Sequence, residues 1–363
     1  MTIDELHILN YKNIEQADLE FSGKLNCFVG LNGMGKTNLL DAIYYLSFCK
    51  SHSNAIDSQN IRHGADYFMV QGRYSRGDES VLVTSSLKQR QKKHFSLNKK
   101  EYTKLTDHIG LIPLVMISPA DMELTEGGSE VRRKFVDGII SQTDRLYLEH
   151  LVQYNMALRQ RNALLKSDVQ PSDDALEPWE AQMVEHARYI HAKRRDFIEE
   201  FKPVFQQYYD TISGHNEQIG LDYLSQLDER DIADMLRDSH QRDYLIGYTT
   251  HGTHKDELEM TLSGHPIKRI GSQGQNKTYL TALKFAQHEL LLNKIGHYPL
   301  LLLDDLFDRL DQQRVERILQ IVGTDKFGQI FITDTNRSHL DLMAAQIKLP
   351  AKMFRVEQGN VIP

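Results

Sequence analysis

Hydrophobic positions along this 363-residue chain change their spacing several times, and each change predicts a different kind of element. Apolar runs at residues 3–9 and 25–29 are typical of strands, and from Lys36 onward leucines and isoleucines recur at helical spacing. Short alternating segments then predict antiparallel strands joined by hairpins. These segments, with one further apolar run, are residues 67–74, 80–87, 94–97 and 111–117. The N-terminal part is therefore expected to be mixed α/β.

The middle of the chain has an amphipathic helical pattern. Residues 129–166 and 179–212 place apolar side chains at intervals of three, four and seven, which gives each stretch one apolar face. Between them, residues 167–178 are polar and include Pro171 and Pro178, so the chain is expected to reverse there. The pattern predicts an antiparallel helical hairpin whose arms, of about 30 residues each, would extend about 45 Å.

Strand-like and helical patterns alternate again towards the C-terminus. The elements expected there are a helix at 275–295, a strand ending at Asp304, a helix at 314–322 and a strand at 329–332. We therefore predict an α/β fold in which residues 1–121 and 245–363 together form one head domain. Residues 122–244 would form a helical lobe inserted into that head.

The composition, with 40% hydrophobic and 26% charged residues, is that of a globular protein. No run approaches the ~20 apolar residues needed to cross a bilayer. Acids among the first six residues do not suit a secretory signal. Only two cysteines occur, Cys27 and Cys49, and both lie in apolar stretches, which suits a reducing compartment. We expect a cytoplasmic protein that does not act at a membrane.

The formal net charge of −7 argues against a uniformly basic nucleic-acid binder, but the charge is unevenly distributed. Residues 88–104 carry seven bases and one acid, a local charge of +6, and smaller basic clusters occur at 132–134 and 193–195. A solvated surface is the plain interpretation of any one such run. Their recurrence favours DNA binding. The candidate DNA contacts are Lys88, Arg90, Lys92, Lys93, Lys99 and Lys100.

A glycine-rich segment at residues 30–37 has the G-x-x-x-x-G-K-[ST] spacing of a P-loop and lies between a predicted strand and a predicted helix. In a P-loop, backbone N–H groups surround phosphate oxygens, a lysine reaches further phosphate, and a hydroxyl binds Mg²⁺. Lys36 and Thr37 would take the last two roles. The predicted ATP contacts are Gly30, Leu31, Asn32, Gly33, Met34, Gly35, Lys36, Thr37 and Asn38. The flanking elements disfavour the alternative, a simple glycine-rich turn.

Four leucines at residues 300–303 lead into Asp304 and Asp305, as in a Walker B motif at the end of a buried strand. Two acids after a strand are often just a turn, but beside a P-loop they indicate a nucleotide and Mg²⁺ site. Asp304 is the expected Mg²⁺ ligand together with Thr37. Asp305 would orient the attacking water, which makes Asp305 and Lys36 the candidate catalytic residues. Asp is one methylene shorter than Glu, so slow hydrolysis of ATP is expected.

A third motif, Gly271 to Gln275, opens the helix predicted at 275–295, so Ser272 and the free N–H groups of that helix form a second anion site. An ordinary helix cap is the alternative. The segment looks like the signature motif of ABC-type ATPases, which binds the γ-phosphate held by the other protomer. The motif order, ending in a segment at 308–311 that resembles a D-loop, fits that class. The residues concerned are Ser272, Gln273, Gly274 and Gln275 in the signature, and Asp311 in the D-loop.

The whole chain resembles one family closely, the RecF family of bacterial recombination mediators, which is related to the heads of SMC proteins. The matching pieces are residues 9–13, 30–43, 118–121, 132–137, 252–258, 272–275 and 301–311. The resemblance implies an ABC-type P-loop ATPase head, a mixed α/β domain with an antiparallel β subdomain and an inserted α-helical lobe. It adds Lys12, in the first matching piece, to the expected ATP contacts.

The resemblance also implies a function. It implies a homodimer, formed head to head with ATP and Mg²⁺, that binds double-stranded DNA at single-strand gaps and junctions and lets go after slow, DNA-stimulated hydrolysis. RecR is the implied partner, with RecO and RecA downstream in DNA repair and replication restart. An SMC-like structural head that tethers DNA would need a longer helical insertion than one that closes at 167–178. A monomeric P-loop kinase would leave residues 271–275 unused and would not dimerise with ATP.

Three segments depart from the family pattern. The switch histidine of transporter ATPases falls near residues 333–335, so no γ-phosphate sensor is assigned. The Q-loop glutamine has no clear match, and residues 118–121 occupy its place in the chain order. Residues 252–257 keep the charge of the family's Gly-Pro-His-Arg-Asp-Asp pattern but lack its proline, and Lys255 is expected to be structural rather than DNA-facing.

Overall fold

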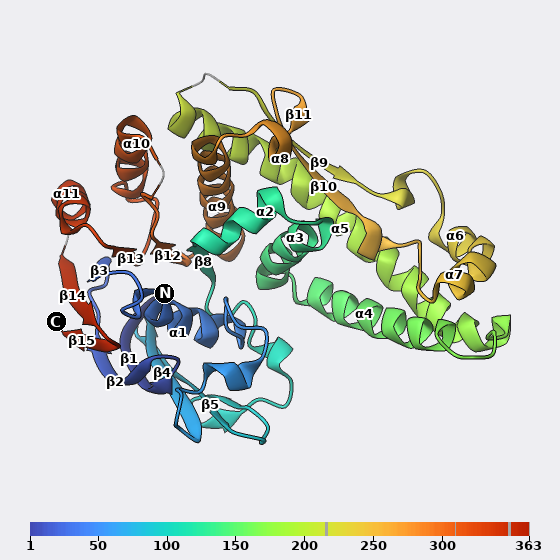
Figure 1. Cartoon of the computed structure of the whole chain (residues 1–363), viewed down its shortest axis with the longest axis horizontal. Coiled ribbons are helices and arrows are strands. Elements are labelled where there is room, and N and C mark those ends of the chain that lie inside the picture. The colour runs from blue at the N-terminus through green and yellow to red at the C-terminus, as the bar shows by residue number, and fades with distance from the viewer. Residues whose placement is uncertain (215–216, 309, 348–349, 363) are drawn as a thin grey trace. The chain divides into compact units, whose positions relative to one another are not determined.

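The computed structural model describes residues 1–214, 217–308, 310–347 and 350–362, and it divides into two compact units (Figure 1). The first unit contains Met1–Asp121, Thr211–Gly214 and Gln273–Pro363, and the second contains Met122–Asp210 and His215–Ser272. The first unit is therefore built from both ends of the chain. In Figure 1, the blue N-terminal strand β3 lies beside the red C-terminal strands with which it pairs.

Two six-stranded sheets form the frame of the first unit. The antiparallel sheet has the strand order β2 (Ile14–Glu20), β1 (Thr2–Tyr11), β4 (Tyr67–Arg76), β5 (Glu79–Lys88), β6 (His94–Leu97) and β7 (Lys100–Glu101). The second sheet has the order β15 (Asn360–Ile362), β14 (Ala351–Glu357), β3 (Leu25–Val29), β13 (Ile330–Asp334), β12 (Leu300–Asp304) and β8 (Leu114–Ile117). All its pairings are parallel except that of β14 with β15.

The hydrophobic patterns explain why the two sheets differ. Strands β12 and β13 are buried at every position, as expected for parallel strands that are covered on both faces. Strand β4 alternates instead, with Phe68, Val70 and Tyr74 fully buried, which leaves its other face to solvent. Helix α1 (Lys36–Phe48) contacts strands of both sheets, and a continuous apolar core joins them. This core positions α1, and with it the loop that joins α1 to the C-terminal end of β3.

Of the remaining helices of the first unit, one precedes β12 and the other two follow β12 and β13. They are α9 (Gln273–Ile295), α10 (Gln312–Val322) and α11 (Arg337–Ile347), with the short 3₁₀ turns η1 (Asp57–Asn60), η2 (Leu105–Asp107) and η3 (Pro119–Met122). Among the described residues, no helix combines the length and hydrophobicity that crossing a membrane requires.

The second unit combines helices with a small antiparallel sheet of order β11, β10, β9. Its strands are β9 (Ile219–Leu224), β10 (Glu257–Leu262) and β11 (His265–Pro266). Its helices are α2 (Glu123–Glu126), α3 (Ser129–Thr143), α4 (Arg145–Leu165), α5 (Asp173–Ser213), α6 (Ile232–Asp238), α7 (His240–Ile246) and α8 (Ile267–Ile270), with 3₁₀ turns η4 (Gln226–Asp228) and η5 (Thr253–Lys255).

Helices α4 and α5 form an antiparallel hairpin. The Nδ1 atoms of His150 and His186 lie 2.9 Å apart, and Arg161 donates to Glu180 at 2.8 Å, so residue numbers rise along one helix as they fall along the other. The predicted turn at 167–178 is shorter in the structure, because α5 begins at Asp173 and includes Pro178. A proline this close to a helix start removes only one hydrogen bond near an exposed end, so the helix continues.

The division into units differs from the boundary predicted at residue 245. Residues 245–272 belong to the second unit because β10 pairs along its whole length with β9, from Glu257 opposite Leu224 to Leu262 opposite Ile219. This ladder joins segments on either side of residue 245. The predicted assignment of the functional lobes stays a prediction.

Candidate nucleotide site

The loop between β3 and α1 has the backbone of a phosphate-binding loop. Gly33 and Gly35 have φ angles of 80° and 111°, in the left-handed region that favours glycine. At Gly30, an added Cβ atom would lie 2.3 Å from the carbonyl oxygen of Val356 in β14, so only glycine fits there. Gly35 caps α1 without a side-chain hydrogen bond. The start of α1 therefore suits an anion, which the first N–H groups of a helix attract.

Lys36 and Thr37 both point back to neighbouring protein groups. The Nζ atom of Lys36 donates to the carbonyl oxygens of Gly30 at 2.8 Å and Leu31 at 3.1 Å, and Lys36 is only 4% exposed. The hydroxyl of Thr37 lies 3.0 and 2.8 Å from the two carboxylate oxygens of Asp304. Thr37 and Asp304 are 267 positions apart, but they meet because β3 and β12 flank β13 in the same parallel sheet.

The carboxylate of Asp304 has a second hydroxyl donor. Thr333, at the end of β13, donates to Asp304 Oδ1 at 2.7 Å, and its hydroxyl accepts the backbone N–H of Asp305 at 3.0 Å. Burial raises the pKa of Asp304, and the hydrogen bonds from Thr333 and Thr37 oppose that rise. Burial also raises the pKa of Asp305, and the charge of Lys36 lowers it. The site therefore holds two carboxyls in a partly desolvated setting next to a lysine.

Thr37 and Asp304 fit a magnesium ion. Mg²⁺ takes oxygen ligands and usually binds to one or two carboxylates, phosphate oxygens and several waters. The hydroxyl and the carboxylate already lie within 3.0 Å of each other. Across the described part of the chain, no group of three or more His, Cys, Asp or Glu side chains could hold a metal ion. One hydroxyl and one carboxylate leave the remaining coordination positions of Mg²⁺ to phosphate oxygens and waters.

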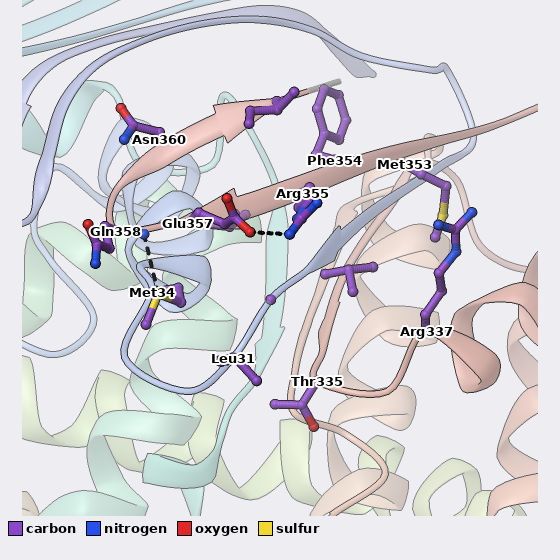
Figure 2. A pocket seen from close by; sticks show the side chains of 14 residues that line it. Leu31, Met34, Thr335, Arg337, Met353, Phe354, Arg355, Glu357, Gln358 and Asn360 are labelled. Atoms are coloured by element: carbon purple, nitrogen blue, oxygen red, sulfur yellow. Dashed lines mark hydrogen bonds and ion pairs between the residues drawn. The ribbon is translucent and has the colours of Figure 1, made fainter.

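A groove lies beside the P-loop and is lined by Leu31 and Met34, by Thr335 and Arg337 after β13, and by the β14–β15 hairpin (Figure 2). The hairpin contacts the loop directly. The backbone N–H of Gly359 donates to the carbonyl oxygen of Met34 at 2.8 Å. Because the carbonyl oxygen of Val356 also packs against Gly30, the C-terminal hairpin contacts the P-loop at two points.

Comparison with known proteins assigns the chain to a family. The model described as RecF/RecN/SMC N terminal domain matches residues 2–359. The DNA replication and repair protein RecF of Bacteroides fragilis is 54% identical over 362 residues, which is 99% of this chain and 98% of the relative. The protein of the same name in Parabacteroides distasonis is 53% identical over 364 residues, with 100% and 99% covered. The chain belongs to the RecF family.

A solved structure described as the recombination mediator protein RecF-ATP in the RecFOR pathway has the same fold. It matches with a TM-score of 0.89 and 28% identity, covering 99% of this chain and 97% of that one. The predicted ABC-type head, with mixed α/β and antiparallel sheets and a helical insertion, is therefore confirmed for this RecF family member.

The predicted signature and D-loop residues of this RecF family member lie at two helix starts. Helix α9 begins at Gln273, so Gly274 and Gln275 are in its first turn and Ser272 directly precedes it, where serine commonly caps a helix. Asp311 caps α10, with its carboxylate accepting the N–H of Arg314 at 2.9 Å. Their contacts with a second protomer stay predictions.

Lys12 is engaged with the P-loop helix rather than with the loop itself. Its Nζ atom lies 2.6 Å from the carboxylate of Asp41 and donates to Ser53 Oγ at 2.6 Å. The side chains of Lys12 and Asp41 are 9% and 1% exposed. Asp41 also accepts from the hydroxyl of Tyr11 at 2.6 Å. The contact of Lys12 with ATP stays a prediction.

Residues 118–121, which occupy the place of the unmatched Q-loop glutamine in the chain order, form a buried polar link. Asp121 accepts the N–H of Ser118 at 2.7 Å and forms an ion pair with Lys284 of α9 at 2.7 Å. The two charged side chains are 8% and 9% exposed. The segment is thereby tied to the helix that carries the signature.

Five of the six predicted DNA contacts are exposed, namely Lys88, Arg90, Lys92, Lys99 and Lys100. Asn98 and Lys99 have φ angles of 50° and 67°, so they form the tight turn between β6 and β7 that presents this charge. Lys93 differs, because its side chain is 14% exposed, pairs with Asp57 at 2.8 Å and donates to the carbonyl of Cys49. In the structure, Lys93 holds the hairpin to the body of the unit.

Sequence reasoning did not assign three residues that support the site. Asn13 accepts from Asn38 at 2.7 Å and donates to the carbonyl of Met34 at 3.3 Å. Thr333 bonds both Walker B residues, and Gly359 holds the P-loop. Asn13 and Thr333 lie in segments that the RecF resemblance or the switch position marks, whereas nothing in the sequence pattern points to Gly359.

Proposed function

We propose that this chain is a recombination mediator of the RecF type, which binds ATP with Mg²⁺, dimerises head to head and holds double-stranded DNA at single-strand gaps and junctions. The observation that carries the proposal is the meeting of Thr37 and Asp304 beside a P-loop. Full-length identity of 54% to a RecF protein and the match to a RecF-ATP structure support it.

The P-loop would bind the phosphates of ATP through backbone N–H groups and Lys36. For this, Lys36 must turn from the carbonyl oxygens of Gly30 and Leu31 towards the β- and γ-phosphates. Thr37 and Asp304 would hold Mg²⁺, which neutralises charge that develops on the phosphate oxygens. Ser272 and the first turn of α9 would meet the γ-phosphate of ATP held by a second protomer.

Hydrolysis would release the dimer. Asp305 is the residue that would accept a hydrogen bond from the attacking water, and its short side chain is expected to keep turnover slow. Because two ATP molecules would lie in the interface, nucleotide state and dimer population would be linked by mass action. DNA would be bound through phosphates by the β5–β7 hairpin, with little sequence preference. RecR is the proposed partner, with RecO and RecA downstream.

Light scattering with and without ATP and Mg²⁺ tests the dimer. We expect the native protein to double its mass with ATP and Mg²⁺, and the Ser272→Arg variant to stay at the mass of a monomer. Ser167→Arg, at an exposed serine in the turn between α4 and α5, is the matched control and should dimerise like the native protein. Equal masses for native and Ser272→Arg proteins with ATP would contradict the proposed interface.

A further inference from the structure

The side chain of Thr333 forms hydrogen bonds with both Walker B residues, Asp304 and Asp305. It is fully buried at the end of β13 and pairs in register with Asp304 of the neighbouring strand β12. Its hydroxyl donates to Asp304 Oδ1 at 2.7 Å and accepts from the N–H of Asp305 at 3.0 Å. A single hydroxyl thus uses its donor and an acceptor on the two adjacent residues.

The backbone at Asp305 needs such support. Its φ angle of 46° lies in the left-handed region, which a non-glycine residue keeps only when its surroundings hold it there. On the other side of the residue, Lys277 of α9 donates to the carbonyl oxygen of Asp305 at 2.8 Å. The N–H and C=O groups of Asp305 are therefore both bonded to side chains from other elements.

The Thr333 contact also differs from the Thr37 contact with the same carboxylate. Thr37 is a candidate Mg²⁺ ligand, so its hydrogen bond to Asp304 must change when the ion binds. The second hydrogen bond of the Thr333 hydroxyl is with the backbone N–H of Asp305. Its hydroxyl can keep one oxygen of Asp304 fixed while the rest of the carboxylate takes part in metal binding.

We propose that Thr333 is a positioning residue for ATP hydrolysis, one that fixes the Asp304 carboxylate for Mg²⁺ and sets the direction in which Asp305 leaves the sheet. The proposal rests on the proposed function, since it assigns Thr333 to that same nucleotide site. The hydroxyl is the essential group. Serine at this position should therefore work, and valine, which has the shape of threonine without its hydroxyl, should not.

The test compares Thr333→Val with Thr333→Ser, and uses Thr84→Val as the matched control. Thr84 lies in β5, where its hydroxyl accepts from Gln71 at 2.9 Å, so the same chemical change is made away from the site. Two quantities are measured for each protein: kcat and KM for ATP, and the gain in affinity for a fluorescent ATP analogue when Mg²⁺ is added. Circular dichroism confirms folding, and Thr333→Ala replaces the valine variant if that variant does not fold.

We expect Thr333→Val to lower kcat roughly ten- to hundredfold, the rate equivalent of one hydrogen bond to a charged group. It should also lose most of the Mg²⁺-dependent gain in affinity, while its affinity without Mg²⁺ stays within about twofold of native. Thr333→Ser and Thr84→Val should resemble the native protein in all three quantities.

Two results would overturn the assignment. One is a valine variant with native kcat and a native gain from Mg²⁺. The other is a serine variant as impaired as the valine variant, which would show that volume matters rather than the hydroxyl. If the native protein hydrolyses ATP no faster than Lys36→Ala, the proposed function fails, but the Mg²⁺ titration still decides the role of Thr333.

Discussion

Arg194 of α5 holds a buried polar cluster together in the second unit. Its Nε and Nη2 atoms donate to the two carboxylate oxygens of Asp137, each at 3.0 Å. Its Nη1 atom donates to Asp256 Oδ2 at 2.7 Å and to the carbonyl oxygen of Thr253 at 2.8 Å. The side chains of Arg194 and Asp256 are 4% and 0% exposed. The variant Arg194→Met would keep much of the apolar volume and leave two carboxylates without their cation.

The size of the expected loss follows from what remains around those carboxylates. Removing one partner of a buried ion pair costs about 3–5 kcal/mol. Asp256 would keep the hydroxyl donors Tyr223 and Ser225, and Asp137 would keep Tyr147, so each charge retains partial solvation. The loss should therefore lie at the lower end, about 3 kcal/mol of unfolding free energy.

Urea unfolding followed by tryptophan fluorescence measures this loss in the right part of the molecule. The chain has one tryptophan, Trp179, and it lies in α5 of the second unit. The next residue supplies the matched control, because the side chain of Arg195 is 57% exposed and its ion pair with Asp196 is long, at 3.9 Å. Arg195→Met should change the unfolding free energy by less than about 0.5 kcal/mol, as exposed pairs contribute little.

If the unfolding free energies of Arg194→Met and Arg195→Met differ by less than about 1 kcal/mol, the buried cluster does not stabilise the second unit as proposed. The pH dependence gives a second check. Burial raises the pKa of Asp256 and Arg194 lowers it, so the carboxyl binds its proton at higher pH when the arginine is absent. A buried carboxylate with a raised pKa costs stability at high pH, and that cost falls as the pH falls. The deficit of Arg194→Met should therefore shrink towards acid; a constant deficit would refute the unpaired-charge explanation.

Three further changes have defined outcomes. Gly30→Ala puts a Cβ atom 2.3 Å from the carbonyl oxygen of Val356 in β14, so it should weaken ATP binding and lower the unfolding free energy by about 1–3 kcal/mol. Gly23→Ala is the control, because a Cβ atom there has no neighbour within 4 Å and should change neither quantity. Thermal unfolding measures the stability, and a nucleotide titration measures the binding. Burial lowers the pKa of His254 to about 4, so the folded protein keeps this side chain neutral while the unfolded chain takes up a proton near its ordinary pKa of 6.5. The unfolding free energy should therefore fall by about 2 kcal/mol between neutral pH and about pH 5. The variant His254→Gln should lack this fall in unfolding free energy when unfolding is followed by tryptophan fluorescence at both pH values. Replacing Lys99 and Lys100 by Glu should weaken binding to duplex DNA and make the binding constant less dependent on salt concentration. If the salt dependence of the binding constant is unchanged, these two lysines do not contact DNA phosphates.

The centre of the candidate site could be predicted because its residues follow strands of one parallel sheet. The glycine spacing before Lys36 and the acids after the leucine run each mark the carboxyl end of a buried strand, and such ends share one edge of a sheet. That rule alone brings Thr37 to Asp304 without knowledge of the chain between them. The structure has these two side chains in hydrogen-bond contact.

The supporting contacts could not be predicted, because they depend on strand order rather than on local pattern. Thr333 bonds Asp304 only because β13 lies between β3 and β12, and a lone threonine at a strand end carries no signal for that. Gly359 holds the P-loop because β14 pairs with β3, a pairing between residues at opposite ends of the chain. Lys12 was assigned to ATP by resemblance, and its partner Asp41 became visible only when β1 and α1 were placed together.

Side chains from two sequence pieces that resemble the RecF family, 132–137 and 252–258, meet in one polar cluster of the second unit. Arg132 forms an ion pair with Glu257 at 2.7 Å, and Asp137 and Asp256 share Arg194. Charged residues in such motifs suggest contacts with DNA or nucleotide, but Arg194, Asp137 and Asp256 are largely buried and already form ion pairs with one another. The family pattern in the second unit therefore reflects how β10 is fixed to α3 and α5. Of the Lys and Arg side chains in these two pieces, only Lys134 and Lys255 are exposed, so a DNA contact in these pieces would have to use those two.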